Sequence, residues 1–384
     1  MTIRRIAINT GGGDAPGLNA VIHAVVHSAE KHGIEVIGIR EGYDGLLEPQ
    51  DYPEGGVLRL DRRKVKGIAH LGGTILGTTN RGNPFARPML QADGSYKEVD
   101  RSDEVLGRLR HLGVDALIAV GGDGSLSIAQ KFAEKGLPVI GVPKTIDNDL
   151  EATVQTFGFD SAVEFATQCI DRLHSTAASH RRILVVEVMG RYAGWIALHS
   201  GLGGRADAIL IPEVPYDLSI VAQRLMENQN FARAYCIVVV AEGAKPRDGE
   251  MTIRGTEVGR EEVRLGGVGE MVAQDLGRLT GKETRAVTLG HIIRGGSPTA
   301  TDRNLGLAFG AAAVRALLEG QKNVMVAIDP PQLLTVPLEK AVSRMKSVPL
   351  DGWAMQTARA LDICFGDEPH RHRSHFPPPS IVPP

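Results

Sequence analysis

Acidic side chains occur in two short polar turns that each follow an apolar run. Asp123 belongs to G-G-D-G-S at 121–125, and Asp147 and Asp149 belong to P-K-T-I-D-N-D at 143–149. A carboxylate in a glycine turn can hold Mg²⁺ while the amides of the turn bind phosphate oxygens. In the second turn, one aspartate could act as a general base and the other as its support. The structural alternatives are a helix cap for Asp123 and Asx-turns for the second turn.

A further glycine turn, G-G-G-D-A-P-G at 11–17, stands between an apolar run and a helical pattern. Glycines let the backbone approach an anion closely, and a helix N-terminus offers unpaired N–H groups. The turn matches neither G-x-G-x-x-G nor G-x-x-x-x-G-K-[ST]. By itself it therefore fits an ordinary strand-to-helix turn as well as a phosphate site.

Basic residues gather in two regions, 181–191 and 285–294. Arginines beside glycines at strand ends can bind a sugar phosphate through forked hydrogen bonds. The alternative, a salt bridge at a domain edge, is common for any single arginine. Salt bridges alone do not account for eight residues with ionisable side chains that all fall at expected strand ends: Asp123, Asp147, Arg182, Arg191, Glu242, Arg285, His291 and Arg294.

Apolar runs of strand length are expected to position these turns. Most are nearly continuous, which is typical of parallel strands covered by helices on both faces. Helix-period segments alternate with them, beginning at Leu18. This alternation predicts a doubly wound α/β fold, and two sheets rather than one very wide sheet. The runs are 6–8, 35–39, 115–120, 138–142, 183–188, 207–211, 235–241, 285–289 and 324–328.

Length and charge narrow the class of protein. The 384 residues carry 43 Lys and Arg against 45 Asp and Glu, a formal net charge of −2. A near-neutral balance argues against a nucleic-acid or membrane-surface partner, because both demand clustered positive charge. Three widely spaced cysteines indicate neither a disulfide framework nor a zinc site. With no apolar segment of signal-peptide or membrane-spanning length, these features predict a cytoplasmic protein.

Three segments are expected to lie outside the regular fold. Residues 78–102 and 244–264 are polar and contain glycine, which predicts surface loops or short hairpins. Residues 370–384 combine His and Arg with a run of prolines, which predicts a disordered tail.

Five motifs, taken together, resemble those of the phosphofructokinase family, whose members phosphorylate fructose 6-phosphate at its 1-hydroxyl with ATP or pyrophosphate. The resemblance covers about residues 3–365. It implies two doubly wound Rossmann-like domains with mostly parallel sheets. The donor domain would comprise 1–158 with 293–345, and the sugar domain 159–292 with 346–369. The motifs are G-G-D-A-P-G-x-N, G-G-D-G-S, P-K-T-I-D-N-D, V-M-G-R-Y-A-G-W and G-H-I-I-R-G-G-S-P, in the family's order and spacing.

On the donor side, the resemblance implies ATP with Mg²⁺, the ion being held by Asp123. Arg81 matches less closely, because many ATP-dependent members place this arginine one residue earlier. The implied donor-binding residues are Gly12, Arg81, Gly122, Gly124 and Ser125.

On the acceptor side, the resemblance implies Asp147 as general base, with Thr145 and Arg191 as further catalytic residues. Arg182 and Arg285 resemble arginines that reach in from a neighbouring subunit, so a homo-oligomer with shared active sites, expected to be a tetramer, would be required. The implied acceptor-binding residues are Thr145, Asp147, Arg182, Met189, Gly190, Arg191, Glu242, Arg285, His291 and Arg294.

The sequence resembles the bacterial members of the family, but two of its positions point to different phosphoryl donors. Gly124 is the residue that leaves room for a nucleotide, whereas pyrophosphate-dependent members usually carry Asp there. Lys144 is typical of pyrophosphate users, whereas Gly is typical of many ATP-dependent members. We weight Gly124 more heavily, because a missing side chain opens space that Lys144 does not need to close. ATP is the expected donor and pyrophosphate the alternative.

Two other functions remain open on the same fold. One is a catalytically silent sugar-phosphate sensor, which Asp123 and Asp147 argue against, since a sensor needs neither a metal carboxylate nor a base. The other is a kinase for a different acceptor, such as sedoheptulose 7-phosphate or NAD. The M-G-R and G-H-I-I-R segments favour a sugar phosphate over NAD.

Overall fold

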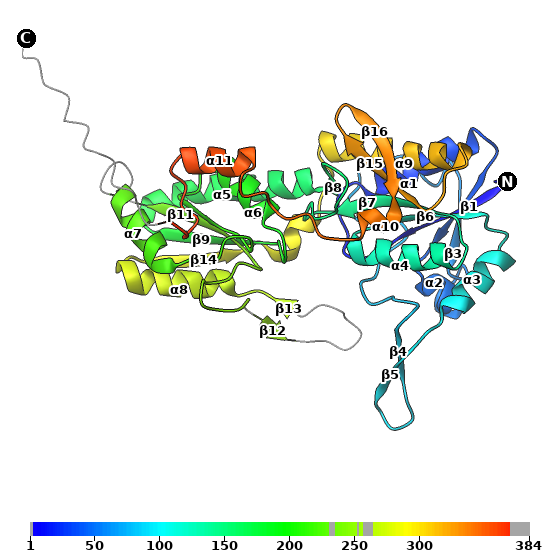
Figure 1. The fold of residues 1–384 in the computed structure, drawn as a ribbon, viewed down its shortest axis with the longest axis horizontal. Helices are drawn as coiled ribbons and strands as arrows, with labels where there is room; N and C mark the ends of the chain where they lie inside the picture. The colour runs from blue at the N-terminus through cyan, green and yellow to red at the C-terminus, as the bar shows by residue number, and fades with distance from the viewer. Residues whose placement is uncertain (1–2, 230–234, 252, 256–263, 369–384) are drawn as a thin grey trace, which may run out of the picture.

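The computed structural model describes residues 3–229, 235–251, 253–255 and 264–368. The chain forms two lobes that lie end to end, each built around its own sheet (Figure 1). The predicted disordered tail at 370–384 lies outside the described residues. In the described part of the chain, none of the helices combines the length and apolar character that crossing a membrane requires.

The larger sheet lies in the lobe that contains the N-terminus (Figure 1). Its central strands pair in parallel, as predicted, but the pairs at its two edges, β2 with β3 and β15 with β16, are antiparallel. In sheet order the strands are β16 (Gln332–Pro337), β15 (Val324–Asp329), β7 (Val139–Thr145), β6 (Ala116–Gly121), β1 (Arg5–Thr10), β2 (Glu35–Ile39) and β3 (Val57–Leu60), with β8 (Phe157–Gly158) paired to β7.

Helices cover both faces of this sheet because its strands are apolar on both sides. Ile118 and Val120 of β6 belong to the core beneath one layer of helices, and Leu117 and Ala119 to the core beneath the other. Alternate residues of a strand point to opposite faces, so a continuous apolar run needs a cover on each. The first layer contains α1 (Leu18–Glu30) and α9 (Ala300–Leu318); the second contains α2 (Asp44–Leu47), α3 (Ser102–His111), α4 (Asp123–Glu134) and α10 (Leu338–Ala341), with η1 (Pro49–Asp51) following α2.

The helices α1 and α9 pack closely through two glycines that lie one helical turn apart. A Cβ on Gly306 would lie 2.9 Å from the carbonyl oxygen of Gly17, and a Cβ on Gly310 would lie 2.6 Å from that of Val21. Such distances leave no room for a side chain. The two glycines therefore allow the close approach of α1 and α9.

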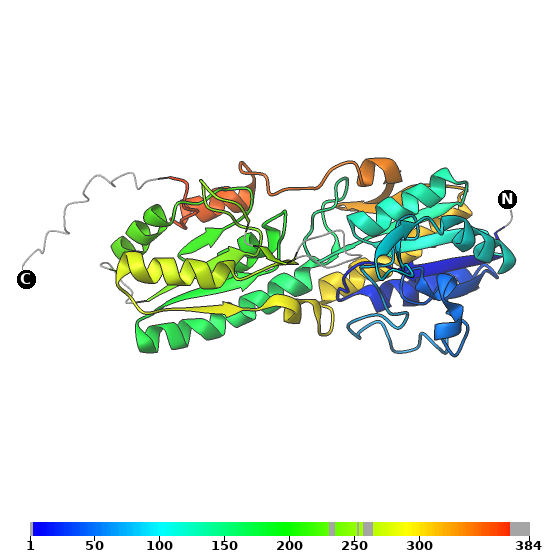
Figure 2. The ribbon, with the colours of Figure 1, turned by 90° about the horizontal axis from the view of Figure 1, so that it is seen from below.

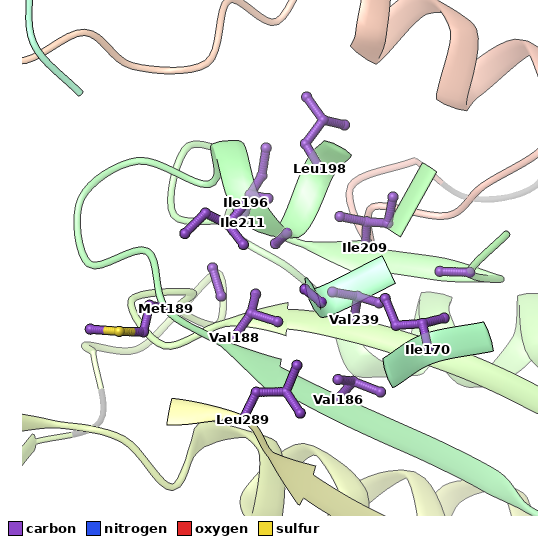
Figure 3. Packing of buried hydrophobic residues seen from close by; sticks show 14 of the residues in the cluster. Ile170, Val186, Val188, Met189, Ile196, Leu198, Ile209, Ile211, Val239 and Leu289 are labelled. Carbon is purple, nitrogen blue, oxygen red and sulfur yellow. The ribbon is translucent and has the colours of Figure 1, made fainter. Parts of the chain in front are cut away.

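The smaller sheet is parallel throughout and also lies between two helical layers. In sheet order the strands are β10 (Ala208–Leu210), β11 (Cys236–Ala241), β9 (Ile183–Val188) and β14 (Thr284–Thr288). Figure 3 shows Val186 and Val188 of strand β9 packed with Val239 of the adjacent strand β11, with Ile209 of β10 beyond it, and with Ile170. The layers are α5 (Phe159–His180), α6 (Trp195–Gly203) and α11 (Trp353–Ala360) on one face, and α7 (Leu218–Gln229) and α8 (Val268–Thr280) on the other.

The chain passes between the lobes three times: between β8 and α5, between η2 (Gly290–Arg294) and α9, and between α10 and α11. The strands of the larger sheet lie within 1–158 and 293–345, and those of the smaller sheet lie within 159–292. The exact domain boundaries stay a prediction.

Two antiparallel hairpins occupy the polar segments, as expected. They are β4 (Arg87–Leu90) with β5 (Tyr96–Val99), and β12 (Ile253–Gly255) with β13 (Arg264–Leu265). The sequence analysis missed the edge strands β3 and β16. Exposed Arg59 interrupts β3, and β16 has exposed residues at both ends and in its middle, so neither has the continuous apolar run by which the buried strands were recognised.

A matched pair of substitutions tests the glycine contact between α1 and α9. Gly310→Ala should lower the melting temperature, because its methyl group would meet the carbonyl oxygen of Val21, an overpacking that costs about 1–3 kcal/mol. Gly107 lies exposed on α3 with nothing within 4 Å of an added Cβ. Gly107→Ala should instead stabilise by about 0.5–1 kcal/mol. Thermal unfolding followed by circular dichroism measures both; a Gly310→Ala protein as stable as wild type would contradict the close-packing argument.

Candidate active site

The carboxyl ends of β1, β6 and β7 are neighbours in the larger sheet, so the turns that follow them meet. The Gly11 N–H donates to the carbonyl of Val120 at 3.0 Å. A Cβ on Gly11 would lie 2.6 Å from Ser125 Oγ, which explains why glycine is needed there. Gly12 has a φ of 76°, in the left-handed region that favours glycine. The predicted donor residues Gly12 and Ser125 thus lie side by side.

A third segment, residues 78–81, lies against the same turn. The Gly12 N–H donates to Thr79 O at 2.9 Å, and the Thr78 hydroxyl donates to Gly12 O at 2.6 Å. The predicted donor residue Arg81 follows on this segment and is exposed. The sequence analysis missed Thr78, because its role depends on a contact with residues far away in the chain.

The turn at 121–125 presents its polar groups to open space. Gly122 is the N-cap of α4, and Asp123 is the first residue of that helix. The alternative that Asp123 itself caps the helix is therefore wrong. Asp123 and Gly124 are both exposed, and a Cβ on Gly124 would meet nothing within 4 Å. There is room beside Gly124 for part of a ligand.

Lys144 is buried at the end of β7, with 3% of its surface exposed. Its amine donates to the carbonyl of Gly13, and a Cβ on Gly12 would lie 3.3 Å from Lys144 Nζ. Burial, and then the nearby Arg294, lower the pKa of Lys144 to about 8, against the opposing effect of carboxylates that include Asp149. Lys144 therefore stabilises the glycine turn from the buried side, through its hydrogen bond to Gly13 O.

Residues 145–149 form one compact loop, in which the local side-chain hydrogen bond is made by a threonine rather than by the predicted Asx-turns. The Asp147 N–H donates to Thr145 Oγ1 at 3.0 Å, and Asn148 has a left-handed φ of 52°. Burial, and then the charges of Asp147 and Asp123, raise the pKa of Asp149 to about 7. A Cβ on Gly122 would lie 3.4 Å from Lys144 O and 3.9 Å from Thr145 Cβ, so the two acidic turns lie against each other.

The carboxyl edge of the smaller sheet brings together the next group of predicted residues. Met189 is buried, Gly190 has a φ of 134°, and Arg191 is half-buried. The Glu242 N–H donates to Val188 O at 2.9 Å, and a Cβ on Gly243 would lie 1.8 Å from Arg191 O. Gly243 was missed by the sequence analysis, although a glycine directly after the candidate Glu242 was a usable signal.

The short helix η2 connects this edge to the larger sheet. His291 is exposed on it. Arg294, at its end, donates from Nη1 to Asp14 O at 3.2 Å. A Cβ on Gly13 would lie 2.8 Å from the same nitrogen. Arg294 thus brings the carboxyl edges of the two sheets together at one place.

Arg182 and Arg285 do not join this group within one chain. They lie at the amino ends of β9 and β14, and both form ion pairs with Glu283, at 3.1 Å and 2.8 Å. Arg191 follows the opposite end of β9, a strand of 6 residues. At about 3.3 Å per residue the two ends are separated by about 20 Å.

A lysine from a distant segment also contacts the acidic loop at 145–149. Lys346 Nζ donates to Asn148 Oδ1 at 2.9 Å. The sequence analysis missed it, because a single lysine in an irregular segment carries no local signal.

The acidic residues fit Mg²⁺. Among the described residues, no three His, Cys, Asp or Glu side chains are grouped closely enough to enclose a metal ion. Mg²⁺ needs no such cage, since it keeps several waters and takes one or two carboxylates together with substrate phosphates. Buried Asp149 Oδ1 has no hydrogen-bond partner in the described part of the chain, and exposed Asp123 on the adjoining turn is one of the charges that raise the pKa of Asp149. Both are oxygen ligands of the kind that Mg²⁺ prefers.

Comparison with known sequences gives a consistent result. The family model described as Phosphofructokinase matches residues 5–317. The chain is 48% identical over 365 residues to the ATP-dependent 6-phosphofructokinase of Chloroflexus aurantiacus, covering 95% of this chain and 98% of that protein. It is 47% identical over 348 residues to the pyrophosphate–fructose 6-phosphate 1-phosphotransferase of Streptomyces coelicolor, covering 90% of this chain and 96% of that protein.

Solved structures agree with the sequence comparison. Phosphofructokinase from Saccharomyces cerevisiae has a TM-score of 0.73 and 31% identity, covering 88% of this chain and 45% of the yeast chain. This chain therefore spans less than half of the yeast chain but nearly all of the Chloroflexus protein. With a family model that matches most of its length and relatives close to half identical, this chain belongs to the phosphofructokinase family.

Proposed function

We propose that this chain transfers a phosphoryl group from ATP to the 1-hydroxyl of fructose 6-phosphate, giving fructose 1,6-bisphosphate in glycolysis. The observation that carries the proposal is the contact of Arg294 with the glycine turn at 13–14. This contact joins the carboxyl edge of the smaller sheet, with its candidate sugar-phosphate residues, to the carboxyl edge of the larger sheet, with its candidate donor residues. A coupled assay of the purified protein, offering ATP and pyrophosphate separately with fructose 6-phosphate, tests it directly.

The donor is assigned to the larger sheet. The turn at 122–125, beside Gly12, supplies backbone N–H groups and open space at the N-terminus of α4, where an anion is favoured. Asp123, with Asp149 nearby, would hold Mg²⁺, which when bound neutralises charge on the phosphates. Arg81, exposed on the adjoining segment, is placed to reach the donor phosphates.

The acceptor is assigned to the smaller sheet. Met189, Gly190 and Arg191 form one side of the acceptor site, and Glu242 follows on the adjacent strand. His291 and Arg294 lie on η2, where a guanidinium can bind a sugar phosphate with two parallel hydrogen bonds. These side chains would orient the sugar with its 1-hydroxyl toward the acidic loop.

The acidic loop is assigned to the proton transfer. In phosphoryl transfer the protein mainly positions the groups and neutralises charge, yet the attacking hydroxyl must still lose its proton. Asp147 would accept it, with Thr145 holding the loop through its hydrogen bond to the Asp147 N–H. Arg191 would stabilise the negative charge that develops on the transferred group.

The mixed donor signature has a structural rationale. Nothing stands within 4 Å of a Cβ on Gly124, so the space that a nucleotide would need is open. Lys144 supports the turn at Gly13 from a buried position and does not close that space. Pyrophosphate remains the second candidate donor, because Lys144 lies close to Gly12 and one relative of similar identity is named for that substrate.

The positions of Arg182 and Arg285 favour a homo-oligomer, which we propose to be a tetramer. Both lie at the end of the smaller sheet away from Arg191, so within one chain they cannot meet the same sugar phosphate. A neighbouring subunit could bring them to its partner's site.

Removing the proposed base should reduce turnover and spare sugar binding. Asp147→Asn should lower kcat by about 10²–10⁴-fold with little change in the KM for fructose 6-phosphate. Asp103→Asn, at an exposed position on α3, is the control and should behave as wild type. A folded Asp147→Asn enzyme that keeps more than about a tenth of wild-type kcat would show that Asp147 is not the base.

Adding a carboxylate at residue 124 should remove the use of ATP. Two unit charges about 4 Å apart at an effective dielectric constant of 20 repel by about 4 kcal/mol, so Gly124→Asp should weaken ATP binding severely. The control, Gly107→Asp, places the same side chain at another open helical glycine. Steady-state kinetics with each donor measures the effect. A wild-type enzyme that runs on pyrophosphate and ignores ATP would make Lys144 the dominant determinant.

Mixing two inactive variants should restore activity if active sites are shared. Asp147→Ala lacks the proposed base, and Arg285→Ala lacks a proposed arginine from the neighbouring subunit. Subunit exchange between them would create some sites that have both groups. Activity is measured after exchange has been verified by mass spectrometry, and a mixture that stays inactive would argue against sharing through Arg285.

A further inference from the structure

A strap, residues 342–352, joins α10 in the larger lobe to α11 in the smaller lobe. Figure 1 shows this orange-to-red segment crossing between the lobes, and Figure 2 shows it passing along one side of the molecule. No residue of the strap was singled out by the sequence motifs. Its contacts nevertheless converge on both loops to which catalysis was assigned.

The side chain of Lys346 makes its hydrogen bonds to the segment that follows Asp147. Its Nζ donates to Asn148 Oδ1 at 2.9 Å, to Thr153 O at 2.9 Å and to Val154 O at 3.0 Å. An ammonium group has three N–H donors, so all three are used. Burial lowers the pKa of Lys346 to about 8, opposed by Asp149 and Glu151.

The backbone of the strap is bound to the same segment. The Lys346 N–H donates to Asp149 O at 2.8 Å, and Met345 forms an antiparallel bridge with Leu150. Asn148, between the two aspartates, has a left-handed φ, and its Oδ1 also accepts from Thr156 N–H at 3.1 Å. Lys346 thus holds, from outside, a residue whose backbone conformation is unfavourable without such support.

On its other side, the strap is bound to the V-M-G-R-Y-A-G-W loop. Trp195 Nε1 donates to Lys346 O at 3.0 Å, and Lys346 Nζ lies 5.6 Å from the Trp195 ring centroid. Val348 N–H donates to Glu213 Oε1 at 2.8 Å, and Gly194 N–H donates to the same carboxylate at 3.1 Å. One lysine therefore connects the loop of Asp147 with the loop that carries Arg191.

We propose that Lys346 is a positioning residue for phosphoryl transfer, which fixes the geometry of Asp147 and Asp149 relative to the acceptor loop. The assignment rests on the proposed function. All three N–H donors of Lys346 Nζ are bound to protein oxygens, which leaves none for a substrate, so its loss should displace the base without removing a binding contact. A displacement of about 1 Å in such a group lowers turnover by about 10²-fold.

Lys346→Met keeps the length of the side chain and removes the ammonium group. It should lower kcat by about 10–100-fold while the KM for each substrate stays within about threefold of wild type. The matched control is Lys340→Met, at an exposed position on α10 in the same part of the chain, which should leave kcat unchanged. Circular dichroism and the melting temperature establish that each variant is folded.

A double-mutant cycle separates positioning from a general structural role. Asn148→Ala removes the side-chain acceptor of the Lys346 ammonium group. The fold-decrease in kcat of the double variant, Lys346→Met with Asn148→Ala, should therefore be clearly smaller than the product of the fold-decreases of the two single variants. Multiplicative losses would show that the two residues act independently. If Lys346→Met does not fold, Trp195→Phe replaces it: this variant removes the indole donor to the strap but keeps an aromatic ring, and it should lower kcat by about 3–10-fold at unchanged KM.

The outcomes are distinct. If the wild-type protein transfers phosphate to fructose 6-phosphate from neither ATP nor pyrophosphate, the proposed function fails. If the wild-type enzyme turns over and folded Lys346→Met matches it within about twofold, the proposed function stands and the role of Lys346 is overturned. An unchanged kcat in Trp195→Phe would overturn it in the same way if Lys346→Met does not fold.

Discussion

Arg294 ends a short helix that follows the smaller sheet, yet its guanidinium donates to Asp14 O and lies against Gly13, in the first turn of the larger sheet. This contact holds the carboxyl edges of the two sheets face to face. Ligands of open α/β sheets bind at such edges. Because two edges meet here, groups suited to a phosphoryl donor and groups suited to a phosphorylated acceptor are brought to one place.

Buried charges of both signs accompany this arrangement. Burial and neighbouring carboxylates raise the pKa of Asp149 to about 7, and burial lowers the pKa values of Lys144 and Lys346 to about 8. Lys144 supports the glycine turn, and Lys346 supports the acidic loop from the opposite side. Fixed charges and dipoles held away from water are the main means by which a protein stabilises a transferring phosphoryl group, since they need no rearrangement during the reaction.

Unusual backbone conformations are found where these groups are held. Asn148 and Gly190 both have positive φ, and Gly243 approaches Arg191 O too closely for any side chain. Glycine adopts a positive φ without strain, whereas the left-handed conformation of Asn148 persists when surrounding contacts support it. The contacts come from distant segments: Lys346 for the acidic loop, and the β11 end for the loop of Arg191. The site is therefore built from loops that could not keep their shape outside this fold.

Local patterns were enough to predict two mostly parallel sheets, the buried strands and the turns that carry Asp123, Asp147 and Arg191, because strand and helix periodicity and turn chemistry are properties of neighbouring residues. The family resemblance supplied the residue roles. The meeting of the two edges could not be derived locally, since Arg294 and Asp14 are 280 residues apart and Lys346 and Asn148 are 198 apart. Such contacts follow from how the chain crosses between the lobes, which no short segment encodes.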